Sequence, residues 1–142
     1  MRLFLAAACV LALLAGCGSG GTSPSSVVRA WSQALNAGDN DAAADLFAPD
    51  AEVVQGSVVV TLHTHADAVA WNTDLPCSGK IVSLSAQGPV VRATFVLGDR
   101  KSSPCDGPGK RAAAVFRIRR GKIVLWHQVP TGGPSTSTIP AV

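Results

Sequence analysis

Histidine and aspartate supply most of the side chains that could move a proton in this 142-residue chain. The candidates are His63, His65, Asp67, Asp74 and His127. Asp67 lies three residues after Thr64, a spacing typical of a helix capping box. His127 follows Trp126 in a segment expected to be a strand, so the two side chains point to opposite faces. We expect Trp126 to face the interior and His127 to face solvent, and we assign no catalytic residue.

A metal site has little support in the sequence. His63 and His65 project to the same side if their segment is extended, and they could then supply two ligands. The sequence shows no evident third ligand. Cys77 and Cys105 lie in no Cys-x-x-Cys motif or Cys/His cluster of ligand spacing. We therefore predict neither a metal nor a cofactor.

Residues 1–16 resemble the signal peptide of a bacterial lipoprotein. Arg2 precedes an apolar run at 3–14, which is shorter than the roughly 20 residues that span a bilayer. The run closes with Leu14-Ala15-Gly16-Cys17. In bacterial lipoproteins that cysteine carries diacylglycerol and becomes the first mature residue, and two acyl chains anchor stably. The resemblance implies that Cys17 is lipidated, which would hold the protein on the extracytoplasmic face of the cell membrane; the alternative is an ordinary secretory signal.

The remaining cysteines predict a disulfide. Cys9 lies in the signal segment and Cys17 would be consumed by lipid, which leaves Cys77 and Cys105. An even pair outside the cytoplasm indicates a bond between them. Closing a loop of this length stabilises a fold by roughly 3–4 kcal/mol on the chain-entropy account.

Composition predicts one domain between two loose ends. Residues 17–25 are rich in glycine and serine and are expected to form a flexible tether, and residues 131–142 a flexible tail. Residues 26–130 remain as a domain large enough to bury a core. The chain is rich in alanine, valine and arginine and poor in lysine, a composition that suits a high-GC actinobacterium.

Three helices are expected in the first half of this domain. The first is expected to begin at Ser25 or Ser26. A second follows Asp39 and carries Phe47 on its packed side until Pro49-Asp50 turns the chain. β-Branched residues then predict a short hairpin at 53–62, and a third helix follows Thr64. Four more strands are expected at residues 81–85, 90–97, 112–119 and 123–129.

This order of elements resembles the nuclear-transport-factor-2-like superfamily, also called SnoaL-like or ketosteroid-isomerase-like. The similar segments are Ala34-Leu35-Asn36-Ala37-Gly38-Asp39, Leu46-Phe47-Ala48-Pro49-Asp50-Ala51 and Gly121-Lys122-Ile123-Val124-Leu125-Trp126. The resemblance covers nearly the whole domain. It implies an α+β fold, in which a cone-shaped curved antiparallel sheet wraps around three N-terminal helices and encloses an apolar pocket.

The isomerases of this superfamily use a tyrosine, a basic aspartate and a protonated acid. Their positions fall at Trp31, at about Gln55 and at about Ala114. The chain contains no tyrosine at all. Because all three functional groups are missing, the resemblance excludes that isomerase chemistry here.

Aromatic residues from different elements are expected to converge inside the cone. They are Trp31, Phe47, Trp71, Phe95, Phe116 and Trp126. Their convergence either fills the core or leaves an apolar pocket for a lipid-like or ring-shaped ligand. The sequence leaves both possibilities open.

Charge is divided unevenly along the chain. Between Gly18 and Asp74 there are seven acidic residues and one basic residue, whereas ten basic and two acidic residues follow Leu75. Basic residues are expected on strand faces and in the long 99–110 loop region: Arg92, Arg117, Arg119, Arg100, Lys101, Lys110 and Arg111. Such a surface could rest on anionic headgroups or simply be a solvated face. Nucleic acid is not an expected partner, because no aromatic residue is interleaved with the basic cluster.

Together these patterns predict a lipid-anchored extracytoplasmic domain without catalytic activity. It would bind a small apolar ligand or a neighbouring envelope protein. The alternative is an enzyme, a SnoaL-like cyclase, isomerase or hydrolase whose acid and base residues are not identified. A third possibility is an interaction module with a filled cone, which pairs with a partner or forms a homodimer.

Overall fold

The computed structural model describes residues 21–132. The predicted signal peptide, Cys9 and Cys17 lie outside the described residues. In chain order the elements are α1 (Pro24–Asn36), α2 (Asn40–Ala44), β1 (Phe47–Gln55), β2 (Val58–Leu62), α3 (His65–Asp74), β3 (Ser78–Gln87), β4 (Val90–Gly98), β5 (Arg111–Arg119) and β6 (Lys122–Val129). Among the described residues, no helix has both the length and the apolar character needed to cross a membrane.

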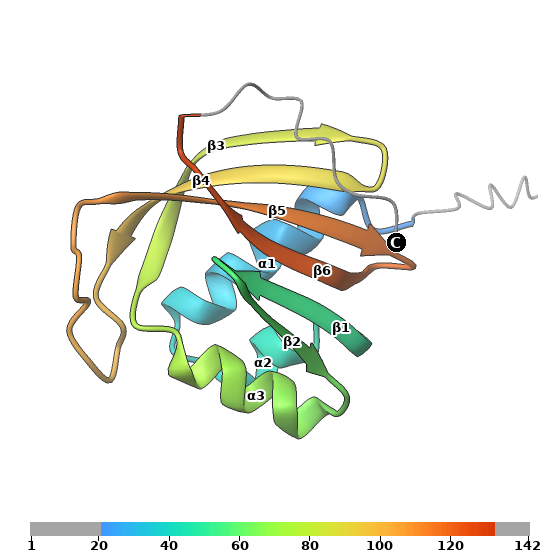
Figure 1. Cartoon of the computed structure of the whole chain (residues 1–142), viewed down its shortest axis with the longest axis horizontal. Coiled ribbons are helices and arrows are strands. Elements are labelled where there is room, and N and C mark those ends of the chain that lie inside the picture. The colour runs from blue at the N-terminus through green and yellow to red at the C-terminus, as the bar shows by residue number, and fades with distance from the viewer. Residues whose placement is uncertain (1–20, 133–142) are drawn as a thin grey trace, which may run out of the picture.

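One curved sheet wraps around the helices, so the expected α+β fold is confirmed (Figure 1). Its strand order is β2-β1-β6-β5-β4-β3. Four of the neighbouring pairs are antiparallel, but β1 runs parallel to β6. The sheet is therefore mixed, which corrects the expectation of a wholly antiparallel one. The β1–β2 hairpin joins the sheet through this single parallel ladder.

The first helix begins earlier than expected. Ser23, and not Ser25 or Ser26, is the N-cap, and its hydroxyl accepts a hydrogen bond from the backbone N–H of Ser26. Pro24 occupies the first turn, where a residue without an N–H costs no helical hydrogen bond. The carboxyl-terminal part of the expected tether is therefore helical.

The second helix is shorter than expected. It ends at Ala44, and Phe47 is the first residue of β1 and not a helical residue. Pro49 and Asp50 do not turn the chain out of a helix; they lie where the pairing of β1 with β6 shifts register between Phe47 and Glu52. Proline has no ladder donor and is tolerated at such a bulge, and Asp50 adopts a positive φ of 59° there.

The third helix begins as the sequence predicts. Thr64 accepts from the backbone N–H of Asp67, and the Asp67 carboxylate accepts in return from the backbone N–H of Thr64. These hydrogen bonds lower the pKa of the Asp67 carboxyl; the bond from the backbone N–H of Thr64 has the larger effect and the bond with its hydroxyl the smaller. This reciprocal cap fixes where α3 leaves the β1–β2 hairpin.

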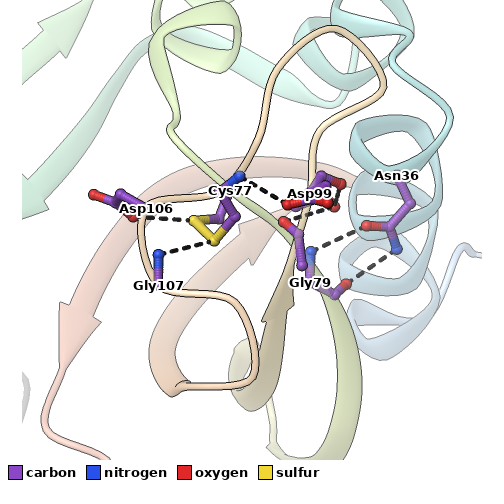
Figure 2. The surroundings of a disulfide bond; sticks show 9 residues. Asn36, Cys77, Gly79, Asp99, Asp106 and Gly107 are labelled. Atoms are coloured by element: carbon purple, nitrogen blue, oxygen red, sulfur yellow. Dashed lines mark hydrogen bonds between the residues drawn. A yellow bond between two sulfur atoms is a disulfide. The ribbon is translucent and has the colours of Figure 1, made fainter.

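A disulfide joins Cys77, just after α3, to Cys105 in the loop between β4 and β5 (Figure 2). The two Cα atoms are 4.6 Å apart, so the structure contains the bond that the cysteine count predicts. The Asp99 carboxylate accepts from the backbone N–H of Cys105 at 2.9 Å. The side chain of Asn36 makes two 3.0 Å hydrogen bonds to the backbone of Gly79. The disulfide therefore ties the long loop to the chain just before β3, and Asn36 ties β3 to α1.

Candidate ligand-binding site

A cavity of about 340 Å³ opens at one end of the cone. This end is formed by the last residues of β1, β4 and β6 and the first residues of β5. The lining residues are Gln55, Leu75, Pro76, Cys77, Phe95, Leu97, Asp106, Ala112, Ala113, Ala114, Trp126 and Gln128. Its volume is at the lower end of the roughly 300–1,000 Å³ common for small-molecule sites.

Phe95 and Trp126 are the two aromatic residues in this lining, and both are buried. Behind them lies Trp31, whose ring centroid is 6.1 Å from that of Phe95 and 6.4 Å from that of Trp126. Phe116 packs edge-on against Trp31 at 5.3 Å and is fully buried. These rings fill the interior of the cone behind the cavity.

The other two aromatics continue this packing toward α3. Trp71 lies 5.0 Å from Trp126, and Phe47 lies 5.5 Å from Trp71, both in edge-to-face geometry. The six aromatics therefore form one continuous cluster, but Trp31, Phe47, Trp71 and Phe116 do not line this cavity. The sequence left open whether the six aromatics fill the core or line a pocket; in the structure two of them line this cavity and the other four pack away from it. The cone is filled at its inner part and open at its mouth.

Trp31 has a partner that the sequence did not reveal. Its indole N–H donates to Oδ1 of Asn72 at 2.9 Å, and the Asn72 amide donates to the carbonyl of Ala68 at 2.8 Å. Asn72 is fully buried. The indole N–H at the position of the isomerase tyrosine is thus committed to the core and is not presented to the cavity.

The polar side-chain groups of the lining residues are two amides, one carboxylate and the indole N–H of Trp126, which has no hydrogen-bond partner among the described residues. Gln55 and Gln128 come from β1 and β6, and Asp106 comes from the disulfide-bonded loop. Asp106 is exposed, and its Oδ1 lies 3.3 Å from Sγ of Cys77 (Figure 2). Asp106 is the one ionisable side chain among the lining residues.

Two positions expected to carry isomerase acids lie in the cavity wall. Gln55 and Ala114, which the resemblance aligns with the carboxyl groups of the isomerases, both line the cavity. A side-chain amide does not titrate near neutral pH, and a methyl group does not titrate at all. At the two positions that the resemblance aligns with the isomerase carboxyl groups, the cavity therefore presents an amide and a methyl group.

The histidines lie elsewhere. His63 pairs with Asp50 at 2.7 Å, whereas His65 contacts Asp41 at 3.0 Å and Asp45 at 3.5 Å. His63 and His65 therefore have separate carboxylate partners and do not act as a pair. The Asp41, Asp45 and His65 group is exposed, and both ring nitrogens of His65 already face carboxylates.

His127 and Trp126 follow the expected alternation. Trp126 is buried, whereas His127 is half-buried on the outer face of β6 opposite Val115. Asp74 is exposed at the end of α3, and Asp67 is the helix cap described above. None of these acid–base candidates lines the cavity.

Arg100 corrects the expectation of a uniformly exposed basic loop. It is 6% exposed, and one of its terminal nitrogens donates to Oδ1 of Asn40. The removal of water around it lowers the pKa of the guanidinium. Arg100 therefore anchors the long loop to the start of α2, while Lys101, Lys110 and Arg111 stay exposed.

Comparison with known proteins agrees with the geometry. The family model of the SnoaL-like domain matches residues 28–126. An NTF2-like protein of unknown function from Cytophaga hutchinsonii superposes with a TM-score of 0.62 at 12% identity, covering 75% of this chain and 88% of that chain. A candidate polyketide cyclase from Sinorhizobium meliloti gives 0.60 at 17% identity, covering 72% and 93%.

A protein from Catenulispora acidiphila with a ketosteroid-isomerase-like fold, solved in complex with trimethylamine, is also similar. Its TM-score is 0.58 at 20% identity, and the match covers 75% of this chain and 85% of that chain. No curated protein matches the sequence. At these identities the structural likenesses establish the fold and carry no activity to this chain.

Proposed function

Because the chain belongs to the SnoaL-like domain family, we propose that its cavity binds a small apolar molecule without catalysing a reaction on it. The observation that carries this proposal is the lining, which combines Phe95, Trp126 and aliphatic side chains with a single ionisable group. Apolar surface of this kind favours a ligand that leaves water readily. The lining contains no lysine or arginine, and Asp106 disfavours an anionic ligand.

The same residues support a role in binding without catalysis. General acid–base catalysis needs groups that titrate within hydrogen-bond reach of the substrate. Gln55 and Gln128 would orient a ligand by hydrogen bonds but do not titrate near neutral pH, so they supply neither a general acid nor a general base. Asp106 alone supplies no matched acid and base.

A cyclase is the second candidate, supported by two structural neighbours that are candidate polyketide cyclases, from Sinorhizobium meliloti and Pseudomonas putida. In that case Asp106 would act as the base at the cavity mouth. One substitution distinguishes the two candidate functions. Asp106→Asn would abolish turnover of a polyketide by a cyclase, but would leave the affinity for a neutral ligand almost unchanged in a binding protein.

We also propose that lipid on Cys17 holds this domain at the extracytoplasmic face of the cell membrane. The small-residue segment before Cys17 supports the anchor, and the Cys77–Cys105 disulfide suits a compartment outside the cytoplasm. Cys17→Ser should release the protein from membranes or leave it unprocessed. Detergent partitioning and intact mass test this, and a mature wild-type protein without a diacylglyceryl adduct would contradict it.

Titration with N-phenyl-1-naphthylamine, a neutral fluorescent probe, tests the cavity. Ala112 lines the cavity, so Ala112→Leu fills part of its volume and should weaken probe binding at least tenfold. Ala70 is exposed on α3, so Ala70→Leu makes the same chemical change away from the cavity. Equal binding by the wild type and both variants would refute this site.

A further inference from the structure

A basic hairpin turn lies where the described chain begins. The basic turn consists of Arg119, Arg120 and Lys122, together with Gly121, and it joins β5 to β6. All three cationic side chains are exposed. Thr22 Cβ is 3.9 Å from the place that a Cβ on Gly121 would occupy. The turn and the start of the described chain therefore share one end of the domain (Figure 1).

The charge of this turn is not balanced by carboxylates. Within the part of the chain that the structure describes, none of the three cations lies within ion-pair distance of an aspartate or glutamate. Lys122 donates to the backbone carbonyl of Asp45, whose carboxylate lies 3.5 Å from His65 instead. The hollow beside Arg120 is lined by uncharged residues: Gly21, Thr22, Pro24, Pro89, Ile118 and Gly121.

The turn also places arginine at an unusual backbone position. Arg120 and Gly121 have φ values of 51° and 73°, between the paired residues Arg119 and Lys122. Two consecutive positive φ angles define the type I′ hairpin turn, in which asparagine or glycine is preferred at the first position. A long cation in that place is costly for the backbone and points to a role for its charge.

We propose that the basic turn docks on anionic lipid headgroups and thereby sets the orientation of the domain on the membrane. This inference rests on the proposed lipid anchor at Cys17. Gly21 is the fourth residue after Cys17, and an extended chain of that length reaches at most about 14 Å. The end of the domain that carries the basic turn must therefore lie close to the bilayer surface.

The same reach excludes the opposite orientation. The long loop at the cavity mouth also carries exposed cations, Lys101 and Lys110. However, β5 runs from Arg111 at the mouth to Arg119 at the basic turn, a rise of about 26 Å. With the mouth on the bilayer, the tether would have to span that distance, which exceeds its reach. With the basic turn docked on the bilayer, the cavity at the other end of β5 opens away from the membrane, toward ligands that arrive from the aqueous side.

Amine acetylation of the anchored full-length mature protein tests this orientation. It is reconstituted into vesicles of phosphatidylcholine with phosphatidylglycerol, or of phosphatidylcholine alone, and the labelling of each lysine is measured by peptide mass spectrometry. Lys122 should react about fivefold more slowly on the anionic vesicles, as expected for a cation at such a surface. Lys101 and Lys110 are internal controls and should react equally on both. About 1 M salt should remove the protection, because it shortens the Debye length to about 3 Å.

Paired variants separate docking from anchoring. Arg119→Gln with Arg120→Asn keeps a favourable turn residue and should abolish the protection of Lys122 while the protein still floats with vesicles. Lys101→Gln with Lys110→Gln should leave that protection intact. Equal reactivity of Lys122 on both vesicles in a floating protein, or protection of Lys101 and Lys110 instead, would overturn the docking proposal alone. A protein that does not float would overturn the anchor and the docking together.

Discussion

The Cys77–Cys105 disulfide is predicted to supply a large part of the stability of this domain. The bond closes a loop with a sequence separation of 28 residues. On the chain-entropy account, such a loop destabilises the unfolded state by about 3.6 kcal/mol. The double variant Cys77→Ala with Cys105→Ala should lose about this amount. For a domain of about 110 residues, that loss lowers Tm by about 15 °C.

Guanidinium unfolding followed by circular dichroism measures the loss. The unfolded state without the bond is more expanded, so the midpoint should fall and the m-value should rise. Each single variant should be destabilised nearly as much as the double variant, because either substitution removes the same bond. A loss below about 1 kcal/mol, or single variants whose effects add, would refute the reasoning.

Four further outcomes are expected. Thr64→Ala should destabilise the protein by about 0.5–2 kcal/mol in thermal unfolding, because it removes the α3 cap. The pKa of Asp67 is lower in the folded protein than in the unfolded chain. The contribution of its carboxylate to folding stability should therefore be fully present above the unfolded pKa of about 3.9 and be lost as pH falls through the folded pKa. Asp67→Asn should flatten this acid-dependent part of the stability profile, measured by thermal unfolding at several pH values. Asn72→Ala leaves the buried indole N–H of Trp31 without its acceptor and should lower the free energy of unfolding by about 1–3 kcal/mol, measured by denaturant unfolding. Val59 is 59% exposed on an edge strand of the sheet, so the wild-type protein should associate as its concentration rises in sedimentation, and Val59→Lys should reduce that association without lowering Tm.

Local signals in the sequence predicted much of the fold. The Thr64 and Asp67 capping box involves residues only three apart, so the sequence contains all the information that sets the start of α3. Alternation likewise placed Trp126 inside and His127 outside, because the period of a strand is fixed by its backbone.

The errors arose where distant contacts override local preference. Phe47 follows a run of alanines that favours helix, but it pairs with Ile123 of β6 and so begins a strand. Ser23 was missed as a cap because the glycine- and serine-rich composition around it is typical of a linker. A cap depends on one residue and the proline that follows it, not on average composition.

The candidate site was predicted in part. The isomerase resemblance placed Gln55 and Ala114 at a pocket, and both line the cavity. Asp106 and Gln128 were not identified, because nothing in their local sequence marks the end of the cone that they share. The aromatics were identified as a group, but only the packing distances separate the filled interior around Trp31 from the open mouth.

Anomalous scattering from bound 1-bromonaphthalene tests the central claim most directly. The bromine shows where an apolar molecule binds, and the test does not require the natural ligand to be known. A crystal of the wild-type protein soaked with this compound should show a bromine peak between Phe95, Trp126 and Gln128, and a crystal of the Ala112→Leu variant should show none there. A bromine peak found instead on the exposed valines Val58 and Val60, or no peak at all, would contradict an apolar ligand site in the cone.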